Sequence, residues 1–335
     1  MKKLMVNRQK FIFSILYILF TIALCSFVLT FDWFEYSSIK YQLDTFVYER
    51  MLDAGIYHQQ FTLDNGLISL VSSEILWASV LVFINKFFES NYIFFTLVPG
   101  IIFICYSFFI NKKSTPFYIF LLLHPIAVMF YLNQLRLAFA FAVFFVLATF
   151  IKDRKIFLIA PFLFLIHTSM AFFIFVFYLI DYIVRSKISE YKKILYLVIL
   201  GMISAFVTGP LGSLILGALG DRRADDYSSD QWQTSALTSL YCAAFVIIII
   251  SNFIFVKSKK INFELSTSLV FFSFVVISPV FTGGYPFRFL SAVFPIIIVS
   301  FYYLDNIFKI SAITLIISVG IYMALYQMNI GNLIG

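Results

Sequence analysis

Long apolar runs separated by short polar segments dominate the chain. Residues 11–31, 117–132 and 237–256 are continuously apolar, without the alternation of polar and apolar positions that marks a half-buried strand. A helix needs about 20 apolar residues to cross the hydrocarbon core of a bilayer, and transmembrane β-strands alternate instead. The pattern therefore predicts an all-α polytopic membrane protein with about 10–11 transmembrane segments.

Composition supports a membrane environment. The chain is 62% hydrophobic and 12% charged, whereas about a quarter of the residues of a soluble domain are charged. So few charges cannot cover a water-facing surface. We therefore expect one integral membrane domain over residues 1–335, with outer loops at residues 32–68 and 220–235. The first apolar run is too long for the core of a cleavable signal peptide, so we expect it to be an uncleaved span.

Basic clusters set the expected topology. They border apolar runs at residues 112–113, 152–155, 185–193 and 257–260, and the positive-inside rule assigns such clusters to the cytoplasm. We expect a multi-pass protein of the bacterial cytoplasmic (inner) membrane with a cytoplasmic N-terminus. The polar segments left on the periplasmic or outer side are residues 32–67, 133–136, a tip at His167, residues 220–235 and residues 283–288.

Three segments do not fit straight crossings. Residues 69–88 contain Glu74 and other polar residues, which predicts an amphipathic or re-entrant helix on the outer side. Residues 156–184 are too long for one crossing and too short for two, which predicts a broken hairpin with its tip near His167. A similar break is expected near Pro210. Broken backbone within a membrane is tolerated where it lines protein or a wet cavity.

Arg136 and His167 are candidates for chemistry within this framework. Arg136 follows Asn133 and Gln134 at the outer junction of two apolar runs. A charge there indicates a site facing the bundle interior, or an arginine that only snorkels to the interface. His167 is suited to proton transfer near neutral pH, although a lone histidine in an apolar run can also be a packing residue.

Further candidates lie in the outer segments. Asp44, four residues before Tyr48, and Glu74 are acids, and the apolar neighbours of Glu74 require its charge to find a partner. Paired arginines suit an anion clamp and aromatic residues can stack on sugars, although the same residues also occur in solvated turns. These binding candidates are Arg222, Arg223, Tyr227, Tyr285 and Arg288.

Taken in order, these residues resemble the EpsG-like and Wzy-type family of surface-polysaccharide polymerases. The likeness rests on Asn133-Gln134-Leu135-Arg136-Leu137-Ala138, the basic turn at residues 152–155, and His167-Thr168-Ser169-Met170-Ala171. The family pattern is Asn-Gln-x-Arg-x-x-(Ala), a helix, a basic turn and a helix ending in His-x-Ser-Ala, so Met170 is a departure. Asp44-x-x-x-Tyr48, Glu74 and Arg288 also resemble the family layout.

The resemblance implies a metal-independent membrane glycosyltransferase of the GT-C type without a cofactor. It would polymerise undecaprenyl-diphosphate-linked oligosaccharide repeat units on the outer leaflet, for O-antigen, capsule or exopolysaccharide. Partners would be the lipid-linked donor and acceptor, the bilayer and a chain-length regulator protein, but no nucleic acid. Catalytic candidates are His167, Arg136, Glu74 and Asp44; substrate-binding candidates are Arg222, Arg223, Arg288, Tyr285, Asn133, Gln134 and Tyr227.

Other functions remain open from the sequence. A flippase or transporter for lipid-linked sugars would also need arginines in a cavity, but it should show internal repeats, which we do not find. An O-antigen ligase would share the charge layout with a longer outer domain than residues 220–235. A membrane acyltransferase is a third alternative.

Overall fold

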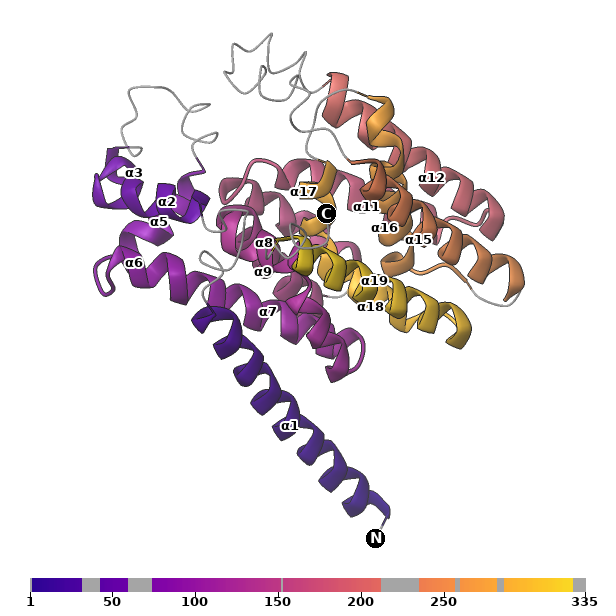
Figure 1. Cartoon of the computed structure of the whole chain (residues 1–335), viewed down its shortest axis with the longest axis horizontal. Helices are drawn as coiled ribbons and strands as arrows, with labels where there is room; N and C mark the ends of the chain where they lie inside the picture. Colours follow the sequence, from indigo (N-terminus) through magenta and orange to yellow (C-terminus); the bar gives the residue numbers. More distant parts are fainter. Residues whose placement is uncertain are drawn as a thin grey trace. The chain divides into compact units, whose positions relative to one another are not determined.

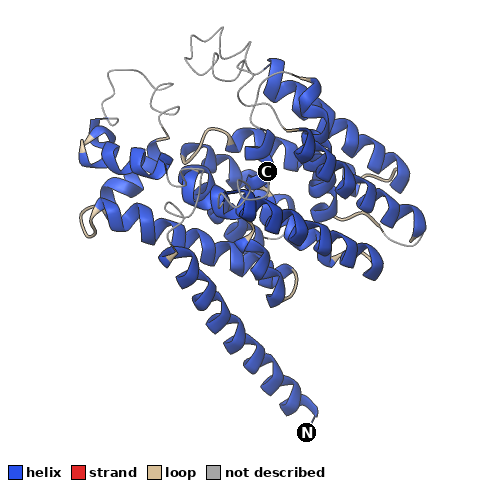
Figure 2. Ribbon diagram, viewed as in Figure 1, coloured by secondary structure: helices blue, strands red, loops and turns tan. Residues whose placement is uncertain are grey.

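A computed structural model describes residues 2–31, 43–59, 74–151, 153–211, 235–256, 260–281 and 286–327. Every regular element in this part of the chain is helical, so the predicted all-α fold is confirmed (Figures 1 and 2). The chain divides into two compact units, residues 1–174 with 321–335 and residues 175–320.

Short helices and irregular turns are frequent in the first unit. Beyond the long α1 (Lys2–Thr30), a group of shorter helices packs around α7 and α9, and α11 leads into the second unit. The elements of the first unit after α1 are α2 (Leu43–Asp53), α3 (Ile56–Gln59), α5 (Ile75–Ile84), α6 (Ser90–Tyr92), the π-helix η2 (Ile93–Leu97), α7 (Val98–Lys113), the 3₁₀ helix η3 (Pro116–Leu123), α8 (Pro125–Asn133), α9 (Leu135–Phe150), η4 (Asp153–Lys155), α10 (Ile156–Ile159), η5 (Ala160–Leu165) and the first turn of α11 (Met170–Arg185), whose remainder belongs to the second unit.

Longer helices make up the second unit, and α16 lies at its centre. Its elements are α12 (Glu190–Phe206), the π-helix η6 (Val207–Leu211), α15 (Ala236–Phe255), α16 (Phe263–Ile277), η8 (Ser278–Val280), α17 (Pro286–Ala292), α18 (Phe294–Tyr302) and α19 (Asn306–Gln327), whose last turns belong to the first unit.

Several helices are long and apolar enough to cross a membrane, which agrees with a polytopic protein. Within the described residues there are five, or six when the bent pair η3 and α8 counts as one span. The five are Ser90–Lys113, Glu190–Leu211, Ala236–Phe255, Phe263–Val280 and Asn306–Tyr326. The total of about 10–11 spans stays a prediction.

The run at residues 117–132 is not the continuous helix we expected. η3 and α8 meet at His124 with a bend of 72°. Pro125 explains the break, because a proline disfavours helical backbone in the residue before it. His124 is accordingly extended (φ −60°, ψ 134°), and its Nδ1 accepts a hydrogen bond from the N–H of Ile126 at 3.2 Å. Histidine and proline together thus end one helix and begin the next.

The other segments predicted to be irregular are short or distorted helices, but α5 is apolar along its length rather than amphipathic. α5 has 10 residues and is about 15 Å long, about half of a bilayer core. The predicted hairpin tip is a turn of residues 166–169 between η5 and α11. Near Pro210 the helix changes to the π-helical η6. Residues 69–73 and 212–234, which belong to the same predicted segments, lie outside the described residues.

Parallel packing of α7 and α9 places their basic ends together. The Tyr106 hydroxyl donates to the Ala138 carbonyl at 3.0 Å, and further along, the Phe108 and Phe150 rings stack with centroids 5.8 Å apart. Lys112 and Lys113, which end α7, therefore lie at the same end of the unit as the basic turn that follows α9. Arg136, in the first turn of α9, lies at the opposite end.

Several basic residues of the second unit likewise lie together at one end. α12 and α16 run parallel, because Glu190 accepts from the Ile261 N–H at 2.9 Å and Gly201 packs against Val270. α15 is antiparallel to α16, since the Ser239 hydroxyl donates to the Val275 carbonyl at 3.5 Å and Phe245 stacks on Phe272 at 4.6 Å. Basic residues at the shared end include Lys192, Lys193 and Lys260.

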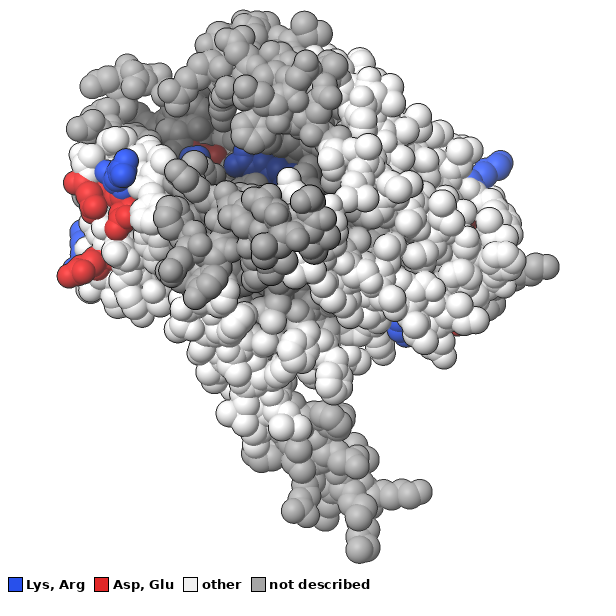
Figure 3. All heavy atoms as spheres, viewed as in Figure 1, with Lys and Arg blue, Asp and Glu red and all other residues white. Residues whose placement is uncertain are grey.

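The surface is largely uncharged on the face that Figure 3 shows. Large apolar side chains are exposed on many helices, among them Phe117, Leu158 and Phe255, each with at least 75% of its surface accessible. Water would penalise so much exposed apolar area, whereas lipid accepts it. The protein is therefore an all-α polytopic membrane protein.

Candidate functional site

Glu74 and Arg136 form an ion pair that joins two separate segments of the first unit. Glu74 is the residue before α5, and Arg136 lies in the first turn of α9, 62 residues away. The Arg136 Nη1 donates to Glu74 Oε2. The Glu74 side chain is 7% exposed and that of Arg136 is 34% exposed. Glu74, whose charge was expected to need a partner, is thus buried beside Arg136, which remains partly exposed.

The turn before α11 supplies the second contact of the same carboxylate. The Thr168 N–H donates to Glu74 Oε1 at 3.1 Å, and the His167 Nδ1 lies 3.6 Å from that oxygen. The ends of three segments, at α5, α9 and α11, therefore meet on one carboxyl group. This brings together Arg136, His167 and Glu74, which the sequence placed in three different polar segments.

The hydrogen bonding of His167 bears on the role predicted for it. The Ser169 N–H donates to His167 Nδ1 at 3.1 Å. A ring nitrogen that accepts a hydrogen bond carries no proton, so the neutral imidazole has its proton on Nε2. In this arrangement Nε2 is a hydrogen-bond donor. The geometry favours a role in donating to an anion over the general-base role that we considered from the sequence.

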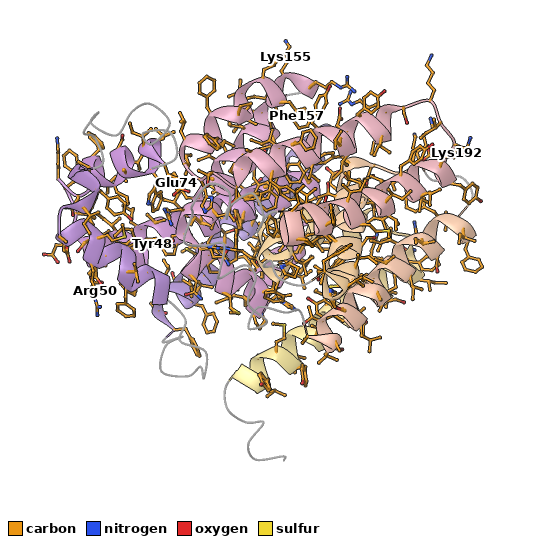
Figure 4. The ribbon with its side chains drawn as sticks, turned by 90° about the horizontal axis from the view of Figure 1, so that it is seen from above. Tyr48, Arg50, Glu74, Lys155, Phe157 and Lys192 are labelled. Carbon is orange, nitrogen blue, oxygen red and sulfur yellow. The ribbon has the colours of Figure 1, made fainter. Side chains whose placement is uncertain are left out.

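Tyr48 supports Arg136 from a fourth segment, α2. The Arg136 Nε donates to the Tyr48 hydroxyl at 3.4 Å, and the guanidinium carbon lies 5.0 Å from the centroid of the Tyr48 ring. Cation–π contact of this kind favours the planar guanidinium. In Figure 4, Tyr48 and Glu74 lie near each other within the first unit, whereas Arg50 extends away from them.

An aromatic shell surrounds this cluster. The Tyr48 ring contacts Trp77 (6.5 Å between centroids) and Phe94 (6.1 Å), and Trp77 contacts Phe139 (5.8 Å). Phe94 belongs to the π-helix η2, a geometry that is frequent at functional sites. Burial raises the pKa of the nearby Tyr57 to about 12, so its hydroxyl stays neutral in the physiological range. The shell keeps Tyr48 fixed and largely dry.

Glu74 has an unusual backbone conformation. Its φ of 58° and ψ of 49° lie in the left-handed region, and it is the only residue other than glycine with a positive φ among the described residues. Such a conformation costs about 1–2 kcal/mol for an ordinary residue and persists where the surroundings hold it. The contacts from Arg136 and Thr168 provide that restraint. Strain of this kind is concentrated at functional sites, which makes Glu74 a stronger candidate.

Asn133 and Gln134 sit at the junction between α8 and α9, directly before Arg136. Both side chains are half-buried, and the Gln134 carbonyl accepts the Ala138 N–H at 2.9 Å as α9 begins. The Thr45 hydroxyl donates to the Leu132 carbonyl and so attaches α2 to this junction. These residues of the sequence motif therefore position Arg136.

The remaining candidates belong to the second unit or have side chains outside the described residues. Arg288 lies in α17 of the second unit and is half-buried. Asp44 belongs to α2, but the position of its side chain lies outside the described residues. The same holds for all of Arg222, Arg223, Tyr227 and Tyr285. Within the described residues, no three His, Cys, Asp or Glu side chains gather as a metal site would require.

Sequence reasoning missed several parts of the site. Nothing marked the Thr168 backbone N–H, the Phe94 shell or the Thr45 contact, because each depends on segments far apart in the chain. Trp77 was detectable, since it follows Glu74 by three residues and thus lies on the same face of α5.

The arrangement is suited to binding an anion. Arg136 uses Nη1 and Nε for Glu74 and Tyr48, and its Nη2 has no hydrogen-bond partner among the described residues. A partly exposed guanidinium with an available N–H, beside a histidine that donates from Nε2, matches the geometry of phosphate oxygens.

Comparison with known proteins identifies the family. The sequence model of the EpsG family matches residues 10–332, nearly the whole chain. Searches of the curated proteins and of the solved structures each found no match. The matched range includes every residue of the cluster, from Tyr48 to Ser169. The chain therefore belongs to the EpsG family and is a membrane protein of polysaccharide biosynthesis.

Proposed function

We propose that this protein is a membrane glycosyltransferase that polymerises oligosaccharide repeat units carried on undecaprenyl diphosphate. The observation that carries the proposal is the cluster of Glu74, Arg136 and His167, which joins three chain segments at one end of the first unit. Membership of the EpsG family supports the polysaccharide substrate class. A GT-C-like architecture and a metal-independent mechanism are part of the same proposal.

The chemistry needs a stabilised leaving group more than a strong acid. An acceptor hydroxyl attacks the anomeric carbon of the donor sugar, and the bond from that carbon to the diphosphate oxygen breaks. The electron pair leaves with the diphosphate, whose negative charge increases in the transition state. Arg136 and the Nε2–H of His167 would stabilise that charge. The proton of the acceptor hydroxyl passes to a carboxylate, with Glu74 or Asp44 as the candidates.

The location of the site fits an outer-leaflet reaction. Lys112, Lys113 and the basic turn at residues 153–155 end helices at one end of the first unit, and Arg136 begins α9 at the other. The positive-inside rule assigns the basic end to the cytoplasm. We accordingly propose that the cluster faces the periplasmic or outer side of the cytoplasmic membrane.

Lipid-linked substrates also need lateral access from the bilayer. Glu74 before the short α5 and the turn of residues 166–169 bring polar groups to the cluster. We propose that the lipid-linked donor and acceptor are the partners at this site. A chain-length regulator protein is a further proposed partner.

The test is a strain that lacks the protein. We expect its surface polysaccharide to lose the ladder of chain lengths while one repeat unit is retained, and the wild-type gene should restore the ladder. Loss of every repeat unit would instead indicate a flippase or a ligase and would refute the proposal. Cysteine labelling tests the sidedness: residues 153–155 should be protected from an external reagent, and residues 221–230 should react.

A further inference from the structure

The Glu74 carboxylate occupies a position that resembles a phosphate-binding site. Its Oε2 accepts from the Arg136 guanidinium and its Oε1 from the Thr168 N–H at 3.1 Å, just before α11 begins. The His167 ring lies 3.6 Å from Oε1. An arginine and a backbone N–H at the start of a helix are donors that commonly bind phosphate oxygens. In this structure a side chain of the protein itself takes that place.

The pair of charges leaves little attraction for a second anion. Glu74 neutralises Arg136, whose side chain is 34% exposed and whose Nη2 lies on the side that Glu74 and Tyr48 do not bind. A diphosphate that approached this side would meet an anionic carboxylate bound to the same guanidinium. Two like charges at so short a distance repel each other strongly where little water surrounds them. A substrate diphosphate and the Glu74 carboxylate therefore cannot both bind Arg136 tightly.

The conformation of Glu74 indicates how the conflict is resolved. Its backbone is left-handed (φ 58°, ψ 49°) directly before a helix of only 10 residues. The carboxylate contacts help to hold that backbone, so their loss would let the residue relax to an ordinary conformation. The free-energy cost of breaking the Glu74–Arg136 ion pair is thus partly offset by relaxation of the strained Glu74 backbone.

We propose that Glu74 is an exchangeable internal anion, which a diphosphate group displaces from Arg136. In the empty site Glu74 keeps the guanidinium oriented and prevents an uncompensated buried charge. In the occupied site phosphate oxygens take over the Nη1 contact as well as Nη2, which gives the forked binding that arginine favours. The exchange adds a binding step to the proposed function. The assignment of the diphosphate to a lipid carrier rests on that function.

The test is the affinity for a diphosphate when the charge of Glu74 is removed. Glu74→Gln keeps an oxygen that accepts from Thr168 but cannot repel an anion. We expect purified full-length protein in lipid nanodiscs to bind inorganic pyrophosphate about tenfold more tightly than the wild type does. Glu89→Gln is the matched control, because it removes the same charge from an exposed position of the same unit and should leave the affinity unchanged.

A second neutral variant keeps the test valid if Glu74→Gln does not fold. Glu74→Asn removes the charge and suits the left-handed backbone better than glutamine does, so it should also tighten pyrophosphate binding. Thermal unfolding identifies which variants remain folded. A folded Glu74 variant that binds pyrophosphate no more tightly than the wild type would overturn the proposal. In that case Glu74 only orients Arg136.

A separate measurement distinguishes a lipid-linked diphosphate from a free diphosphate. A short prenyl diphosphate in the same nanodiscs should bind more tightly than pyrophosphate if the site opens to the bilayer. Equal affinities would assign the exchange to a free diphosphate and refute the lipid-linked ligand. These measurements need no polymerase activity. Loss of all repeat units in the deletion strain would refute the proposed function while tighter binding still supported the exchange.

Discussion

Two arginine–carboxylate pairs, one in each unit, differ in how the chain builds them. In the second unit Arg185 binds Asp181 at 2.7 Å, and the two residues are four apart on one helix. In the first unit Arg136 binds Glu74 across 62 residues. A local pair on a helix surface contributes about 0.3–0.5 kcal/mol and forms wherever the helix forms. The distant pair needs the whole unit to fold around it.

The surroundings of the two pairs differ as well. Arg185 ends its helix among basic residues with its side chain 49% exposed, although its partner Asp181 is buried as Glu74 is. Arg136 is stacked on Tyr48, and its carboxylate partner is buried, strained and bound by a second segment. Ion pairs that are buried contribute little net stability because desolvation offsets their attraction. We therefore infer that the fold maintains the Arg136–Glu74 pair for binding and catalysis. The Arg185–Asp181 pair only anchors a helix end.

The largest effect should come from Arg136→Lys. Lysine keeps the positive charge but loses the planar fork and the stacking on Tyr48, so polymerisation should fall about 100-fold or more. Arg185→Lys should stay within about twofold of the wild type, because an ion pair between neighbouring turns of one helix depends little on the planar fork of arginine. Chain-length profiles at matched membrane abundance measure both. Equal losses in the two variants would remove the distinction between the pairs.

His167 gives the next largest effect, and its two amide variants separate its possible roles. Glutamine places an N–H group near the position of Nε2, whereas asparagine places its amide near Nδ1. If His167 acts as a donor from Nε2, His167→Gln should keep most activity and His167→Asn should lose about tenfold or more, the effect of removing one hydrogen bond to a charged group.

In-vitro coupling of lipid-linked repeats measures the two variants under one set of conditions. An inactive His167→Gln with normal abundance would restore the role of general base. The hydrogen bond from Ser169 to Nδ1 would then have to break during turnover.

Tyr48→Phe sharpens the account of how Arg136 is held. The change removes the hydroxyl that accepts from Nε at 3.4 Å and keeps the ring below the guanidinium. The lost hydrogen bond is long, so we expect activity to fall only a few-fold, a cost of about 1 kcal/mol. Tyr48→Leu removes the ring too and should lower activity further. If Phe and Leu behave alike, the cation–π contact contributes nothing.

Gly201→Ala should change stability and leave catalysis per folded molecule intact. A Cβ at this position would lie 2.5 Å from the Val270 carbonyl oxygen and 2.9 Å from the Ser273 Cβ. Overpacking of this kind costs about 1–3 kcal/mol, so the thermal unfolding temperature should fall. A Gly201→Ala protein with an unchanged unfolding temperature would contradict the close packing of α12 against α16 at this glycine.

Hydropathy alone predicted the helical class and the irregular segments, because membrane helices are recognisable from local composition. The same reasoning missed the bend at His124, where a single proline outweighs the apolar run around it. The site was predictable as a set of residues, with Arg136, His167 and Glu74 all singled out. Their pairing was not, since no local pattern indicates that Glu74 would bind an arginine 62 residues away.

The central claim is that the cluster around Arg136 serves to join lipid-linked repeat units. The most direct measurement is coupling of purified undecaprenyl-diphosphate-linked repeats by the purified protein in nanodiscs. We predict a ladder of products with the wild type and with Arg185→Lys, and only unextended repeats with Arg136→Lys. A wild-type protein that yields no ladder, or an Arg136→Lys protein that yields the full ladder, would contradict the account.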